Sequence, residues 1–202
     1  MAEATAATPV LRDVEEFLAW AEGRTERWQF VEGRLVMMAG AADPHDFLTV
    51  NVILALGKRL EGSPCRPHGP DRGVRIGRRN FYLPDVSVSC RRSDGTVSPE
   101  PVLVVEVLSL ASERDHRGVE WRNYQQLASL RHDLPLSRDE PVAELFSRGE
   151  RGWTRNCFEG LDAEISLEAR AIALPMAERY RDEGAALPVA SELDDPAAAG
   201  TS

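Results

Sequence analysis

The sequence predicts one mixed α/β domain, in which a central β-sheet is flanked by helices. Stretches with helical periodicity are interspersed with short strand-like runs, one strand is almost wholly aliphatic, and no break in composition divides the 202 residues. Apolar residues make up 43% of the chain and charged residues 28%, which is typical of a chain that folds by itself. We expect a single domain over 13–182, between flexible tails at 1–12 and 183–202.

The N-terminal part predicts a helix followed by a β-hairpin. Asp13 and Glu16 have the spacing of a capping box, and apolar residues follow at helical intervals. Residues 28–31 and 34–38 are strand-like and flank a two-residue Glu-Gly turn, which indicates a hairpin.

A second helix is expected between Asp43 and Gly62, packed on the sheet. Its expected apolar stripe comprises Phe47, Val50, Ile53, Leu54, Ala55, Leu56 and Leu60.

The segment VLVVEVL at 102–108 predicts a buried central strand. Its one charged residue is Glu106, and burying a carboxylate costs several kcal/mol unless it is compensated, as a metal or a catalytic role would do. The remaining expected elements are strands at 73–76, 82–83, 86–89, 134–136, 142–146 and 153–158, and helices at 118–127 and 177–181.

The net charge of −9 argues against a protein that coats nucleic acid by bulk attraction. Arginines nevertheless cluster around one strand pair, and they fit a solvated surface and a phosphate-facing patch about equally well. The cluster comprises Arg66, Arg72, Arg75, Arg78, Arg79, Arg91 and Arg92.

The cysteines and the hydropathy predict a soluble cytoplasmic protein. Cys65, Cys90 and Cys157 are far apart and form no C-x-x-C pair, which favours neither a disulfide framework nor a zinc site. No apolar run approaches the roughly 18 residues of a membrane helix, and the N-terminus lacks the features of a signal peptide. We expect no membrane partner and no organic cofactor.

Two carboxylates form a candidate metal site. Asp85 follows Pro84 at the start of one expected strand, and Glu106 lies in the next, so strand pairing would bring them together. Two hard oxygen ligands suit Mg²⁺, with Mn²⁺ as a substitute, and phosphodiester hydrolysis uses such an ion. The alternatives are a turn-capping Asp85 with Glu106 paired to an arginine, or a glycosidase, which the 6% aromatic content disfavours.

An ordered set of motifs runs from about Val14 to Tyr180. It comprises WQFVEGRLVMMAGA at 28–41, His45, FYLPDVSVSC at 81–90, LVVEVLS at 103–109, RG at 117–118 and NYQQL at 123–127. In this set the chain resembles the Uma-two family, restriction endonuclease-like proteins of the PD-(D/E)XK superfamily.

The resemblance implies a restriction-endonuclease-like mixed β-sheet core with an N-terminal hairpin, and a Mg²⁺-dependent endonuclease that acts on DNA. It implies that Asp85 and Glu106 ligate the metal and that the backbone carbonyl of Val107 helps. The family lysine, displaced onto the following helix, aligns with Glu120, and Gln29 stands where a glutamate is usual. Both substitutions would weaken the site, because one places an anion beside the phosphate and the other removes a negative charge.

Three further residues are candidates for substrate binding. His45 matches a family histidine, which either orients the first hairpin, approaches the scissile phosphate, or only hydrogen-bonds the helix terminus. Arg117 and Arg122 lie near the lysine's expected position and either guanidinium could hold phosphate, although neither can act as a base. A third departure is His116, where the family commonly has an aspartate.

Two functions therefore stay open: a Mg²⁺-dependent endonuclease weakened by the two substitutions, or an inactive relative that binds nucleic acid or a protein partner. A module that assembles through paired sheet edges is a third. We expect a homodimer, because a duplex has two strands to cut.

Overall fold

The computed structural model describes residues 9–38, 40, 43–109, 116–168 and 172–180, so most of both expected tails lies outside the described residues. The elements occur in the order α1 (Val14–Ala21), β1 (Trp28–Val31), β2 (Arg34–Met37), α2 (Asp43–Arg59), β3 (Arg66–His68), β4 (Val74–Ile76), β5 (Asn80–Tyr82), β6 (Val86–Ser89), β7 (Pro101–Leu108), η1 (His116–Glu120), α4 (Trp121–Tyr124), β8 (His132–Ser137), β9 (Val142–Gly149), β10 (Gly152–Glu159), β11 (Glu164–Leu167), β12 (Ile172–Pro175) and α5 (Met176–Arg179). The predicted mixed α/β architecture is confirmed.

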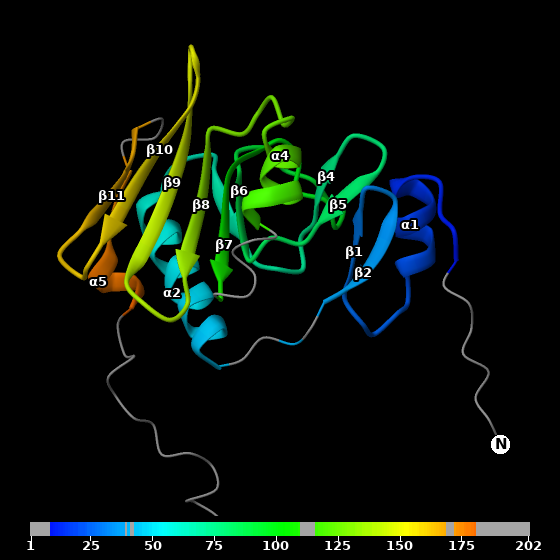
Figure 1. Cartoon of the computed structure of the whole chain (residues 1–202), viewed down its shortest axis with the longest axis horizontal. Coiled ribbons are helices and arrows are strands. Elements are labelled where there is room, and N and C mark those ends of the chain that lie inside the picture. Colours follow the sequence, from blue (N-terminus) through cyan, green and yellow to red (C-terminus); the bar gives the residue numbers. More distant parts are fainter. Residues whose placement is uncertain (1–8, 39, 41–42, 110–115, 169–171, 181–202) are drawn as a thin grey trace, which may run out of the picture.

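A six-stranded mixed sheet with the order β10-β9-β8-β7-β6-β3 forms the centre of the molecule (Figure 1). β7 and β8 run parallel, and the other neighbours are antiparallel. β7 is buried except at Val102, which confirms the prediction of a buried central strand.

Helices cover the two faces of this sheet. Val105 and Val107 of β7 belong to one apolar cluster with Leu56 of α2. Val104 belongs to another cluster with Tyr124 of α4. Because alternate side chains of a strand point to opposite faces, α2 and α4 lie on opposite sides of β7.

The predicted packing of α2 on the sheet is right, but its predicted stripe is partly wrong. Ala55, Leu56 and Leu60 are buried as expected, together with Leu48 and Val52. Exposed instead are Phe47, Val50 and Leu54. The helix is apolar around most of its circumference, so periodicity alone did not identify the buried face.

The first helix and hairpin form as the sequence predicts. The Asp13 carboxylate accepts a hydrogen bond from the Glu16 backbone nitrogen at 3.1 Å and caps α1. Glu32 and Gly33 adopt φ angles of 51° and 83°, the left-handed pair that a tight two-residue hairpin requires. β1 and β2 belong to a second sheet with the order β2-β1-β5-β4.

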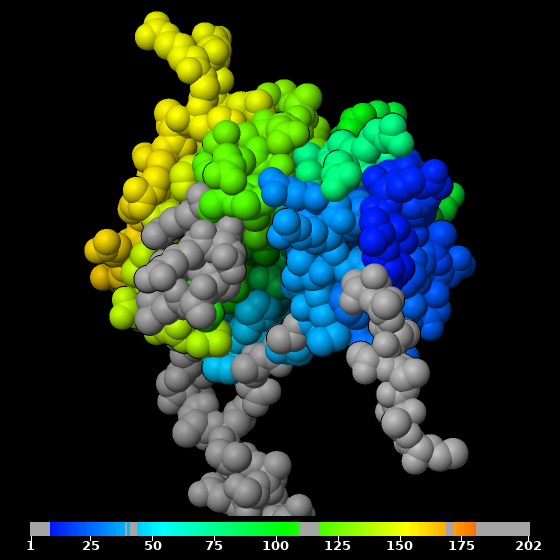
Figure 2. All heavy atoms as spheres, turned by 45° about the vertical axis from the view of Figure 1, so that its right-hand side comes forward, coloured from blue at the N-terminus to red at the C-terminus, as the bar shows by residue number. Residues whose placement is uncertain are grey.

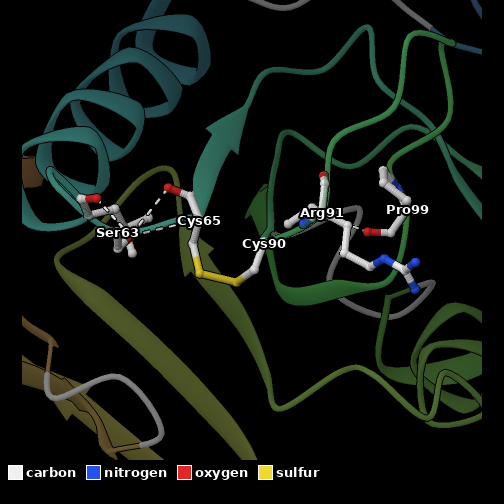
Figure 3. The surroundings of a disulfide bond; sticks show 7 residues. Ser63, Cys65, Cys90, Arg91 and Pro99 are labelled. Carbon is white, nitrogen blue, oxygen red and sulfur yellow. Dashed lines mark hydrogen bonds between the residues drawn. A yellow bond between two sulfur atoms is a disulfide. The ribbon is translucent and has the colours of Figure 1, made fainter.

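The expectation that the cysteines form no disulfide is wrong. Cys65 and Cys90 are joined, and Figure 3 shows the bond between the segment before β3 and the end of β6. Arg66 pairs with Ser89 in the antiparallel β3–β6 ladder, so the next rung brings the two cysteines opposite one another. The pairing follows from this register, which spacing along the chain does not reveal.

The C-terminal half differs in detail from the prediction. The expected helix at 118–127 is the shorter pair η1 and α4, and the antiparallel hairpin β11–β12 was not predicted. No helix in the described part of the chain combines the length and the apolar character needed to cross a membrane.

Candidate active site

The two predicted carboxylates lie at one end of the β6–β7 pair. Val86 of β6 pairs with Val105 of β7 in the last described pair of this ladder, so Asp85, just before Val86, and Glu106, just after Val105, both lie next to that pair. Neighbouring strands are about 4.8 Å apart, which places the two carboxylate residues at the same end of the strand pair.

Asp85 is held by two hydrogen bonds that end on the same oxygen. The backbone nitrogen of Val107 donates to Asp85 Oδ2 at 2.8 Å, and His45 Nε2 lies 3.1 Å from that atom. The N–H and C=O of one strand residue point to the same side of the strand, so the Val107 carbonyl also leaves β7 towards Asp85. The expected trio of Asp85, Glu106 and the Val107 carbonyl therefore shares one corner of the sheet.

Glu106 has a partner that sequence reasoning did not name. The Tyr124 hydroxyl donates to Glu106 Oε1 at 2.9 Å, and both side chains are buried. Burial, with the negative charges of Glu106 and Glu120, raises the pKa of Tyr124 well above its ordinary value, so the hydroxyl stays a donor. The NYQQL motif contains this tyrosine, but only the fold shows which residue it faces.

A second hydrogen-bonded set fixes the short helix that carries Tyr124. Asn123 donates from Nδ2 to the Tyr82 hydroxyl at 2.7 Å and lies 3.3 Å from Asn80 Oδ1. Tyr82 and Tyr124 pack with ring centroids 5.3 Å apart. These contacts join α4 to β5 and keep Tyr124 directed at the sheet.

His45 makes a contact that neither sequence interpretation included. It lies in the first turn of α2, and its hydrogen bond to Asp85 raises the pKa of the imidazole against the opposing effect of burial. Its Nδ1 atom is buried and has no hydrogen-bond partner among the described residues. The observed contact of His45 is therefore with the Asp85 carboxylate.

The predicted cation-bearing segment is less closely tied to this corner. Glu120 is half-buried at the end of η1, and its charge acts on Tyr124. Arg122 is exposed two residues before the buried Tyr124, which puts it on the opposite side of α4. The backbone of Arg117 lies in η1, but its side chain and that of His116 fall outside what is described.

Gln29 lies in β1 of the four-stranded sheet. Its amide nitrogen is 2.9 Å from the Met38 sulfur, a contact within the first hairpin. The structure therefore brings Asp85, Glu106, Val107 and His45 together, whereas the described contact of Gln29 is elsewhere.

The arginine cluster is largely engaged with neighbouring protein groups. Arg75 pairs with Glu15 at 2.6 Å, Arg78 with Asp13 at 3.0 Å and Arg91 with Glu100 at 2.6 Å. Arg72 and Arg79 donate to backbone carbonyls. These contacts favour the surface interpretation over a phosphate-facing patch.

The donor set fits a hard divalent cation. Two carboxylates and one backbone carbonyl are oxygen ligands, and Mg²⁺ typically takes few protein ligands and keeps several waters. Within the described residues no three His, Cys, Asp or Glu side chains gather as a metal-binding group.

The mixed sheet and its flanking helices define an α/β protein with a nuclease-like fold. The crystal structure of a putative nuclease of the DUF820 group from Anabaena variabilis matches with a TM-score of 0.70, over 84% of this chain and 98% of that one, at 13% identity. This confirms the restriction-endonuclease-like fold. The chain belongs to the Uma2 family, described as putative restriction endonucleases, whose model matches residues 14–177.

Two Synechocystis proteins are related over most of their length. The uncharacterized protein slr1290 is 30% identical over 169 residues, which cover 81% of this chain and 87% of that protein. The uncharacterized protein sll1609 is 25% identical over 166 residues, which cover 79% and 94%.

Proposed function

We propose that the protein is a Mg²⁺-dependent endonuclease that hydrolyses phosphodiester bonds in DNA. The observation that carries this is the position of Asp85 and Glu106 on either side of the Val86–Val105 pair, with the Val107 backbone nitrogen bonded to Asp85. Membership of the Uma2 family supports nuclease chemistry. Mn²⁺ should substitute for Mg²⁺, because both take oxygen ligands.

The chain's residues divide the work of holding the ion. Both described hydrogen bonds of Asp85 end on Oδ2, which leaves Oδ1 to face a cation beside Glu106 and the Val107 carbonyl. His45 and Tyr124 keep the two carboxylates in place. When bound, the ion would lower the pKa of an attacking water and neutralise charge on the phosphate.

Glu120 and Gln29 should make this enzyme slow. An anion beside the site repels a phosphate where a lysine would attract it, and Gln29 adds no negative charge for a cation. Arg117 and Arg122 are the cationic residues that lie close to position 120 in the sequence and that could contact the DNA backbone. Arg122, however, is exposed and lies away from Tyr124.

A second candidate is a catalytically inactive protein that binds nucleic acid or assembles with partners. Glu120 is the observation that favours it, because its charge lies close enough to Tyr124 to affect that residue's pKa. In both cases we propose a homodimer, since a duplex presents two strands. We also propose a cytoplasmic location, although disulfides such as Cys65–Cys90 usually persist in oxidising compartments.

Cleavage of supercoiled plasmid and of single-stranded DNA tests the proposal. Wild type should nick DNA with Mg²⁺ or Mn²⁺ and stop with EDTA, and Glu106→Ala should be inactive. Asp94→Ala is the matched control, because it removes an exposed carboxylate from the loop after β6. DNA binding without cleavage under every metal condition would favour the second candidate, and activity retained in Glu106→Ala would overturn the site.

A further inference from the structure

The outermost strand of the central sheet, β10, is a long exposed edge. It pairs residue for residue with β9 over eight positions, from Gly152 with Gly149 to Glu159 with Val142. All its residues are exposed except the half-buried Trp153 and Phe158. The tip of the β9–β10 hairpin stands clear of the body of the molecule (Figures 1 and 2).

Alternate residues of β10 direct their backbone groups away from β9. Gly149 and Gly152 close the two-residue turn, and the Arg148 nitrogen bonds the Arg131 carbonyl near β8, so the odd-numbered residues of β9 face β10. The outward groups of β10 therefore belong to residues 153, 155, 157 and 159. None of these has a backbone partner in the described part of the chain.

The other edges are shorter or blunted. β3 has three residues, and its Pro67 lacks a donor, while β2 has four residues. β10 contains neither proline nor lysine and has no bulge, which are the usual devices that prevent edge pairing. The edge best suited to receive another strand is therefore β10.

Charge selects one partner and one register for this edge. If Arg155 lay opposite itself across a twofold axis, like charges would meet. If the axis passes through Cys157, Arg155 lies opposite Glu159 of the partner, and the reverse pair forms as well. Opposite charges directly across a ladder are favourable, and like charges are unfavourable.

We propose that β10 pairs antiparallel with β10 of a second copy about Cys157, which joins two six-stranded sheets into one. The interface is isologous and forms about six backbone hydrogen bonds from three residue pairs. Such a small interface should give a dimer that depends on protein concentration.

Cys157 reports this register directly. It is exposed, and the other two cysteines are joined to each other. At a hydrogen-bonded antiparallel pair the two Cα atoms lie about 5.5 Å apart, within the range of a disulfide. Oxidation, or a short bismaleimide, should therefore link two chains through Cys157, whereas Cys157→Ser should not crosslink.

The interface specifies the proposed homodimer without touching the candidate site. The ladder Glu106–Pro135–Glu144–Cys157 places three strand steps, about 14 Å, between Glu106 and the edge. Because the readout is the oligomeric state, failure of this proposal and failure of the nuclease proposal are distinguishable.

A charge swap tests the proposal by sedimentation velocity and crosslinking of the full chain. Arg155→Glu and Glu159→Arg should each raise the dimer dissociation constant at least about tenfold, because each places like charges opposite one another. An equimolar mixture of the two variants should restore dimers, because the heterodimer regains opposite pairs.

The mixture separates an interface effect from a folding defect. Arg155 also contacts Glu144, so Arg155→Glu is checked by thermal unfolding, and recovery in the mixture cannot come from a misfolded chain. A monomeric wild type at every concentration would overturn the proposal. So would Cys157 crosslinking that both single variants leave unchanged.

Discussion

The two halves of the candidate site are built differently. The carboxylates are fixed within the sheet, with Asp85 bonded to a strand backbone and Glu106 to a buried phenol. The segment expected to supply a cation is a short π-helical turn and one turn of α-helix, where Glu120 is half-buried and Arg122 exposed. The carboxylates are thus held by buried partners, whereas the residues of the expected cation segment are half-buried or exposed.

The hydrogen bonds of the carboxylates give their replacement a structural cost that is independent of any metal. Replacing Asp85 or Glu106 would leave buried hydrogen-bond donors without acceptors, which costs roughly 1–3 kcal/mol each. The carboxylates could thus persist for stability alone, so metal binding must be tested separately from folding.

The largest expected effect concerns metal binding by the fixed half. Asp85→Ala should weaken Mn²⁺ affinity at least about 100-fold, because losing a direct ligand costs more than the 10–100-fold typical of outer-shell residues. Isothermal titration calorimetry of wild type, Asp85→Ala and Asp94→Ala measures this. Equal affinity in all three would show that the carboxylates are only structural.

A gain of activity should come from the other half. Glu120→Lys should raise the cleavage rate at least about tenfold if the missing cation limits the reaction, because it replaces repulsion of the phosphate by attraction. Glu120→Gln removes the anion without adding a cation and should give a smaller increase. Plasmid nicking rates rank the three proteins. An unchanged rate in Glu120→Lys would mean that the missing cation does not limit the cleavage rate.

A smaller effect on metal affinity is expected from Tyr124, which lies in α4 and contacts Glu106 in the sheet. Tyr124→Phe keeps the ring in the core but removes the hydrogen bond to Glu106, so Mn²⁺ affinity should fall about tenfold while the fold stays intact. Calorimetry gives the affinity and thermal unfolding checks the fold. Tyr82→Phe, which removes the hydroxyl facing Asn123, is the matched control and should leave affinity nearly unchanged.

Sequence patterns predicted the strands beside the carboxylates, but not the side chains that contact the carboxylates. Two strand-like segments were enough to predict that the strands beside Asp85 and Glu106 are neighbours, because antiparallel strands adjacent in sequence commonly pair. Tyr124 and His45 reach the carboxylates from helices on different sides of the sheet, and helix placement is not encoded in a local period. The Cys65–Cys90 bond depends in the same way on one strand register.

Elements with weak local signals were missed or misjudged. β11 and β12 have four residues each, too few for a clear alternation of apolar and polar residues, so the sequence did not distinguish them from a loop. The apolar residues around α2 gave a helix correctly but not its buried face, since Phe47 and Leu54 are as hydrophobic as Leu48 and Leu56. Only the packing partners decide such cases.

The smallest effect provides a pH reference for assays of both halves. Burial lowers the pKa of His132, at the start of β8, to about 4, from 6.5 in the unfolded chain. The unfolded state therefore binds a proton first, and stability that is present above pH 6.5 is lost as the pH falls towards 4. The free energy of unfolding falls with a slope that approaches about 1.4 kcal/mol per pH unit between these two pKa values. From about pH 7.5 to 6 the expected loss of this free energy is under roughly 1 kcal/mol.

Urea unfolding of wild type and His132→Asn across this range measures the effect. Asparagine can keep the hydrogen bond to Ser147, whose hydroxyl lies 3.0 Å from His132 Nδ1, so the variant should unfold with a shallower acid slope. His132 pairs with Leu103 and Pro135 with Glu106, so the histidine lies three residues along the ladder from the site. If the slope is the same in both proteins, acid sensitivity arises elsewhere, and a fall of activity at low pH could then be attributed to the carboxylate half.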